Sequence, residues 1–143
     1  MNTLLKLWRA GQLPIRDALY TLSGEAYSVQ LNDAAPGGIE ILGKFDLDAA
    51  LADDPDWLSS VGSTKEAEIE DGWGRLLVGE GSDGSDGFFA RVDHDNNPQW
   101  VFFFTESNPF IDISTGGREA TFHSSSGVSV TVDIDQPEAG ILG

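Results

Sequence analysis

The sequence WGRLLVG at residues 73–79, with FFARVD at 88–93 and WVFFFT at 100–105, decides the fold of this chain. An acidic glycine-rich loop separates the first two segments, and the polar turn HDNNPQ at 94–99 separates the last two. Six of the eight phenylalanines and two of the four tryptophans lie between residues 73 and 113. The stretch therefore predicts three β-strands around which the core forms.

The third of these segments is apolar on both sides. Because side chains alternate along a strand, Trp100, Phe102 and Phe104 should point to one face and Val101 and Phe103 to the other. A strand of this kind is typical of the centre of a sheet that is covered twice. We expect amino-terminal helices to cover one of the two faces.

Two short helices are predicted at the amino terminus. The spacing of Leu4, Leu7 and Trp8 predicts a helix over residues 3–10, capped by Thr3. A second helix is predicted over residues 14–22, where proline suits the first turn and the apolar residues recur at helical spacing.

The rest of the chain is divided into short elements by turn residues. A short helix is expected at 49–51, capped by Asp46 or Asp48, and Gly62 and Ser63 are expected to be loop residues. Strands are predicted at 26–31, 39–42, 110–113, 120–123 and 128–134. Together these patterns predict one α+β domain over residues 1–143, a mostly antiparallel sheet with the amino-terminal helices packed on one face.

The composition limits the cellular compartments in which the protein is expected. The 143 residues include no cysteine, which excludes disulfides and thiolate metal sites and favours a reducing compartment. Lys6 and Arg9 interrupt the apolar start, so it does not resemble a signal peptide. No segment has the ~18 apolar residues of a membrane span. We expect a cytoplasmic protein that does not enter the membrane.

Charge is the strongest anomaly of the sequence. There are 24 acidic residues against 8 basic ones, a net charge of -16. Such a surface repels nucleic acid and anionic lipid and attracts basic proteins over a long range. Solubility or a salty cytoplasm is the alternative explanation for this charge. The acids are dense between residues 66 and 95, at Glu66, Glu68, Glu70, Asp71, Glu80, Asp83, Asp86, Asp93 and Asp95.

Two short motifs suggest ligand chemistry, and each is incomplete. GEGSDG at 79–84 fits G-x-G-x-x-G, but no helix is predicted to open there and its carboxylates would repel phosphate. DHDNN at 93–97 has the spacing of a calcium loop, but Pro98 replaces the required glycine and Phe104 the required glutamate. A polar turn with side-chain hydrogen bonds explains it better, although weak calcium binding between the two acidic loops stays open.

Histidine offers no catalytic site either. His94 and His123 lack zinc-ligand spacing. His123 precedes three serines, but adjacent residues of a strand point to opposite faces. We therefore expect no catalytic residue, no metal and no cofactor.

The pattern of Gly79-x-Gly-Ser-Asp-Gly, Phe89-Ala-Arg-Val-Asp and Trp100-Val-Phe-Phe-Phe resembles small acidic immunity proteins of polymorphic and contact-dependent bacterial toxin systems. The resemblance covers about 40 residues. It implies a protein that binds and neutralises a cognate toxin, often a basic nuclease, by covering its active site.

We therefore predict a non-enzymatic protein that binds a basic protein. The expected contact residues are Glu80, Asp83, Asp86, Asp93 and Asp95, with Trp73 as an aromatic anchor. One alternative is a DNA mimic that occupies a nucleic-acid-binding protein. Another is an enzyme or small-ligand binder with a pocket between the aromatic strands.

Overall fold

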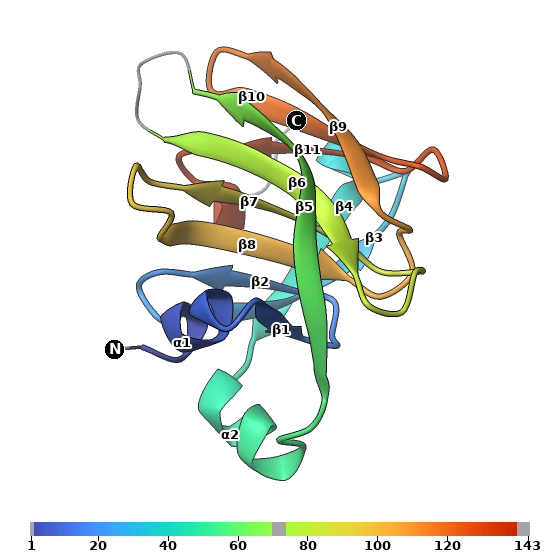
Figure 1. Ribbon diagram of the computed structural model, residues 1–143. Coiled ribbons are helices and arrows are strands. Elements are labelled where there is room, and N and C mark those ends of the chain that lie inside the picture. The colour runs from blue at the N-terminus through green and yellow to red at the C-terminus, as the bar shows by residue number, and fades with distance from the viewer. Residues whose placement is uncertain (1, 70–73, 140–143) are drawn as a thin grey trace.

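The computed structural model describes residues 2–69 and 74–139 and shows a large sheet with a small sheet packed across it (Figure 1). Every strand pair is antiparallel, and two short α-helices complete the fold, which confirms the predicted α+β class. The helices are α1 (Thr3–Arg9) and α2 (Leu47–Asp53), with 3-10 turns η1 (Pro36–Gly38) and η2 (Pro137–Ala139).

The large sheet has eight strands in the order β1-β5-β6-β7-β8-β2-β3-β4, and the small sheet has three in the order β11-β10-β9. The strands of the large sheet are β1 (Gln12–Pro14), β2 (Ala18–Thr21), β3 (Ala26–Leu31), β4 (Ile39–Lys44), β5 (Leu58–Glu68), β6 (Arg75–Gly81), β7 (Gly87–Val92) and β8 (Pro98–Phe104). Those of the small sheet are β9 (Phe110–Gly116), β10 (Glu119–Ser124) and β11 (Ser129–Asp133).

The three strands predicted from the aromatic stretch are β6, β7 and β8, at the middle of the large sheet. Phe89 of β7 lies opposite Val78 of β6 on one side and Phe102 of β8 on the other. On this first face the small sheet closes the core, and the ring of Phe89 stacks on Phe122 of β10 with centroids 4.0 Å apart. Trp100 is buried in the same cluster, as predicted.

The second face of β8 is covered by the amino-terminal part of the chain. Val101 and Phe103 are buried there, packed with Leu4 of α1 and Tyr20 of β2. Trp8 of α1 meets Phe88 edge-on with centroids 6.0 Å apart. The prediction of a central strand covered on both faces, one of them by an amino-terminal helix, is therefore confirmed.

The second predicted helix is wrong, because residues 12–21 form β1 and β2 instead. Leu19 and Tyr20 are both buried but belong to opposite faces of the large sheet. A strand buried on both sides shows no alternation of apolar and polar residues, so its sequence can imitate helical spacing. In α1 the cap is Asn2 rather than Thr3, since its side-chain oxygen accepts from the Leu5 amide at 2.9 Å.

Gly62 and Ser63, expected to be loop residues, lie within β5 instead. β5 runs for 11 residues to Glu68, but most of its side chains are exposed, which explains why hydrophobicity did not reveal it. Asp46 caps α2, as one of the two predicted candidates, by accepting from the Ala49 amide at 3.1 Å. In the described part of the chain, neither seven-residue helix has the length or apolar character needed to cross a bilayer.

Candidate partner-binding surface

The glycine-rich motif lies in the hairpin between β6 and β7. A side chain on Gly79 would overlap the carbonyl oxygen of Gly62 on β5 and the ring of Phe88. Gly84 has a φ of +81°, which the tight turn requires and other residues rarely adopt. The glycines thus serve strand packing and the turn. A second strand, not a helix, follows them, as the sequence predicted.

Asp86 does not lie on the surface, which corrects its prediction as a contact residue. It is 1% exposed, and its Oδ2 accepts from the hydroxyl of Ser59 on β5 at 3.0 Å. A side chain on Gly81 would overlap this carboxylate, so the glycine leaves the space into which the carboxylate folds. Asp86 therefore joins the hairpin to β5 and cannot meet a partner in this conformation.

The remaining predicted acids fall into two separate groups. Glu80 and Asp83 are exposed at one end of β7, whereas Asp93 and Asp95 lie at the other. The six residues of β7 separate the groups by about 20 Å. They do not form one face, and they do not form a shared calcium site. Among residues 2–69 and 74–139 no cluster of His, Asp or Glu has the arrangement of a metal site.

Asp93 stabilises its own turn. Its Oδ1 accepts from the backbone amides of Asp95 and Asn97, each at 2.9 Å, which confirms the predicted polar turn. Partial burial pushes the pKa of Asp93 upward, but the hydrogen bonds from Asn97 and Asp95 outweigh it and hold the pKa below its ordinary value. This carboxylate is committed to local structure. Trp73, the predicted aromatic anchor, lies outside the described residues.

The end that holds Glu80 and Asp83 gathers several distant segments. Ser82 of the hairpin lies 3.0 Å from Ser59, hydroxyl to hydroxyl, and Ser85 donates to the Thr105 carbonyl at 3.1 Å. The Thr105 amide in turn donates to Asp17 at 2.6 Å. These hydrogen bonds bring the segments of Asp17, Asp83 and Glu106 together beside the start of β5, and Asp53, Asp54 and Asp56 precede that start in the chain. We define these six acids, with Glu80 of β6, as the acidic end.

Within the described residues the carboxylates of the acidic end make no ion pair. The basic side chains that do pair are elsewhere: Lys44 with Glu25, Lys65 with Asp112, Arg75 with Glu66, Arg91 with Asp135, and Arg118 with Asp133 and Asp135. Arg16 lies nearby and remains a cation, with its guanidinium donating to the Ser28 hydroxyl and covering the ring of Phe45 at 3.7 Å, so it offsets one of the seven negative charges. The acidic end is therefore a local concentration of negative charge.

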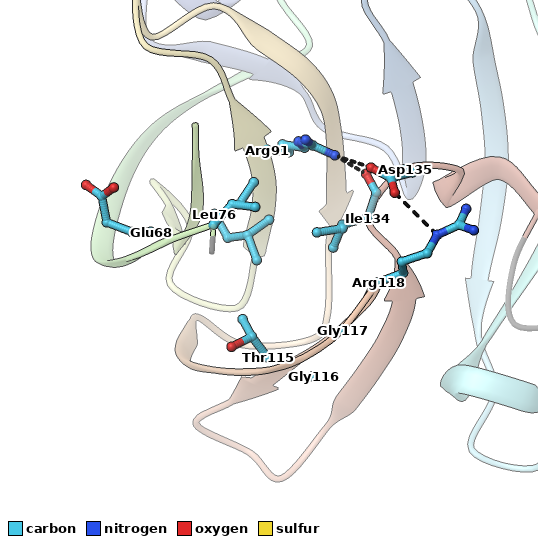
Figure 2. A pocket seen from close by; sticks show the side chains of 10 residues that line it. Glu68, Leu76, Arg91, Thr115, Gly116, Gly117, Arg118, Ile134 and Asp135 are labelled. Atoms are coloured by element: carbon cyan, nitrogen blue, oxygen red, sulfur yellow. Dashed lines mark hydrogen bonds and ion pairs between the residues drawn. The ribbon is translucent and has the colours of Figure 1, made fainter. Parts of the chain in front are cut away.

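Figure 2 shows a cavity of about 510 Å³ at the border of the first face, beside Leu76 and Ile134. Two arginines reach it, but both converge on Asp135, with Arg91 at 2.8 Å and Arg118 at 3.3 Å. The hydrogen bond from Arg91 is the main cause that lowers the pKa of Asp135. Since the guanidinium groups are already neutralised, they offer little attraction to an anionic ligand.

The space between the aromatic strands is filled by their own rings in the part of the structure described. Phe89 alone contacts the rings of Trp100, Phe102, Phe104, Phe110 and Phe122. The cavity of Figure 2 lies beside this cluster and not within it. The geometry thus gives no support to a ligand site between the aromatic strands.

His123 makes contacts that the sequence did not reveal. On the outer face of the small sheet, its Nε2 lies 3.1 Å from the hydroxyl of Ser114 and its Nδ1 3.0 Å from that of Ser129. Both hydroxyls come from the neighbouring strands β9 and β11, not from the serines that follow in sequence. A neutral imidazole donates to one hydroxyl and accepts from the other, so the arrangement ties three strands together.

Comparison of the chain with models of protein families, with curated proteins and with solved structures gives no match. The function must therefore be argued from the geometry. The sequence suggested Trp57 either as an aromatic anchor or as a core residue, and in the structure it is the most exposed large apolar residue of the described chain, at 57%. Its position beside the acidic end makes it part of the surface considered below.

Proposed function

We propose that this protein binds a cationic protein through its acidic end and acts as the immunity partner of a bacterial toxin. The observation that carries the proposal is the gathering of seven carboxylates, without ion pairs in the described residues, from four separate segments. Concentrated charge of one sign steers an oppositely charged partner and speeds its association. The net charge of -16 works in the same direction.

The acidic end also fits this role better than the dispersed acids do. Asp93 is held by its own turn, and Asp112 and Asp135 are held by basic neighbours. In the acidic end Asp17 is held by the Thr105 amide, but the other six carboxylates have no such partner among the described residues and keep their capacity to accept from lysine and arginine of another protein. A toxin that binds nucleic acid carries the complementary positive charge around its active site.

The test begins with a toxin-like open reading frame, which we expect beside the gene for this protein. Binding of its purified product is measured by surface plasmon resonance, with lysozyme and histones as unrelated basic proteins. We expect tight binding to the toxin alone. Broad binding to histones that free DNA competes away would instead indicate a DNA mimic and overturn the immunity role.

Two variants with the same change of charge locate the surface. Replacing Asp53, Asp56 and Asp83 by Asn should slow association about tenfold at low salt and flatten its salt dependence. The matched control changes three exposed acids elsewhere, Asp95→Asn, Glu119→Gln and Glu138→Gln, and should alter the rate less than about twofold. Equal effects of the two variants would show that only net charge matters and that the acidic end is not the binding surface.

A further inference from the structure

An apolar groove opens next to the acidic end, between α2 and the connection from β1 to β2. It has a volume of about 280 Å³. Small-molecule sites commonly hold about 300–1,000 Å³, so this groove suits one or two side chains better than a cofactor. Its apolar walls are formed by Ile15, Phe45, Leu47, Ala50, Leu51 and Trp57.

The helix α2 presents its apolar stripe to this groove. Leu47, Ala50 and Leu51 follow the i, i+3, i+4 spacing of one helix face, and all three line the groove. No residue of α2 is buried, although apolar helix stripes are normally covered. Figure 1 shows that α2 projects from the rest of the molecule, away from the small sheet. The stripe is thus only partly covered by the chain itself.

Trp57 is exposed but held in place. Its indole nitrogen donates to the carbonyl of Ile15, and its own carbonyl accepts from the Ile15 amide at 3.0 Å. Its amide donates to the carbonyl of Asp54 at 3.1 Å. An aromatic side chain that is fixed before binding loses little entropy on contact, which is why such residues anchor interfaces.

The floor of the groove is also fixed. Arg16 covers one side of the Phe45 ring, and the buried Tyr20 meets that ring edge-on with centroids 6.2 Å apart. The groove is therefore a preformed feature that needs no rearrangement to accept a side chain.

We propose that this groove is the docking site for a segment of the cationic partner that carries a large apolar side chain flanked by lysine or arginine. Asp54 lines the groove, and Asp53 and Asp56 lie beside it in the chain, at the helix end and in the turn that leads to Trp57. Arg16 also lines the groove, so the three carboxylates leave a net negative charge for a basic segment. None of the three makes an ion pair in the described chain. The inference rests on the proposed function and specifies where and how the partner is held.

Charge also argues against a second copy of this chain as the occupant. Two copies would bring two net charges of -16 together, and this rim would meet surface of the same sign. Juxtaposed like charges oppose association. A basic segment relieves the repulsion among the rim carboxylates and covers the apolar walls at the same time.

The experiment uses the full chain and two synthetic peptides of equal length and charge. One carries leucine and tryptophan among lysines, and the other carries alanine in their place. By isothermal titration calorimetry we expect the first to bind about tenfold more tightly to the wild type. Trp57→Ala should abolish this preference while the weaker, salt-sensitive binding of both peptides persists, and Trp57→Phe should restore most of it.

The control is Leu42→Ala, which shortens another exposed apolar side chain, 55% exposed on β4, and should leave the preference unchanged. Thermal melting by circular dichroism verifies that each variant folds. Equal affinity of the wild type for the two peptides would overturn the groove as docking site. So would a dimer in sedimentation equilibrium that Trp57→Ala dissolves, because the occupant would then be a second copy.

The proposed function fails on a different result. If replacing Asp53, Asp56 and Asp83 by Asn left the binding of both peptides as tight as in the wild type, the acidic end would not attract cations. That outcome does not depend on whether the apolar anchor contributes. The two inferences are thus separable in one set of titrations.

Discussion

The two faces of β8 are covered in different ways. On the first face a sheet from the same chain closes over the aromatic rings, and Phe89 and Phe122 stack at 4.0 Å in a fully buried cluster. On the second face α1 covers one part, whereas Phe45 and Leu47 beside α2 are only half-buried. This difference indicates where a partner can add contacts. The first face is covered by the chain itself and has no room for a partner, whereas the second face is partly exposed and can be contacted.

The largest effect that tests this comparison is expected from Phe89→Ala. The substitution leaves a cavity among five aromatic rings and should lower the free energy of unfolding by about 3–5 kcal/mol. Phe45→Ala, on the open face, should cost less than half as much because its ring already meets solvent. Both values come from urea denaturation, and similar losses would remove the distinction between the faces.

A smaller loss of stability is expected for Gly79→Ala, in β6 between its neighbours β5 and β7. The added methyl group overlaps the backbone of Gly62 and the ring of Phe88, which costs about 1–3 kcal/mol of unfolding free energy. Gly62→Ala is the matched control, since its methyl group meets nothing within 4 Å. The same urea curves measure both. A tolerated Gly79→Ala would mean that the hairpin packs less closely than described.

Tyr20→Phe should act in the opposite direction. The hydroxyl of Tyr20 is buried on the second face and has no hydrogen-bond partner among the described residues, and this burial raises the pKa of the tyrosine well above its ordinary value. Removing the hydroxyl should raise the free energy of unfolding by about 1 kcal/mol. Tyr27→Phe, at a half-buried tyrosine, should change it little. A loss of stability in Tyr20→Phe would reveal a partner for the hydroxyl.

The smallest effect concerns the border of the first face, where Arg91 holds Asp135. The hydrogen bond from Arg91 keeps the pKa of Asp135 below its ordinary value in the folded protein. The pair therefore stabilises the fold above about pH 4, and this contribution is lost as the pH falls through the lowered pKa. Since Asp135 is 50% exposed, we expect about 0.5 kcal/mol or less.

The measurement for this pair is the carboxyl chemical shift of Asp135 by NMR across an acid titration, together with stability curves at pH 3 and pH 6. Asp135→Asn should reduce the difference between the two curves. If the variant and the wild type lost the same stability on acidification, neither Arg91 nor Arg118 would be coupled to Asp135.

Much of the fold was predictable because strong signals coincide in the aromatic stretch. β6, β7 and β8 carry large apolar residues in short runs between turn residues. The unbroken apolar run from Trp100 to Phe104 indicated that β8 is buried on both faces. The helix predicted over residues 14–22 was wrong for a physical reason. β2 is buried on both sides, so the periodicity that distinguishes a strand from a helix is absent.

The candidate surface was less predictable than the fold. Asp86 is polar and lies in a glycine-rich turn, yet Ser59, distant in sequence, binds it below the surface. The groove joins Ile15, Phe45 and Trp57, which only the tertiary fold brings together. The separation of the two acidic loops could be inferred, because they follow opposite ends of one strand. The sequence could not indicate which of the two acidic loops lies beside an open apolar surface.

The long strand β5 affects the tendency of this chain to aggregate with copies of itself. Val61 still donates its amide to the Gly11 carbonyl at 2.9 Å, but from Gly62 onward β5 pairs with β6 alone among the described strands. Part of a hydrogen-bonding edge is left there, although the side chains of Thr64 and Lys65 reach β9. That edge carries Lys65, Glu66 and Glu68, and a bulge between Ser63 and Lys65 breaks its register. Charge and irregularity on an edge oppose the strand-by-strand addition that leads to fibrils. The exposed edge of β5 is thereby a poor template for the aggregation of this chain.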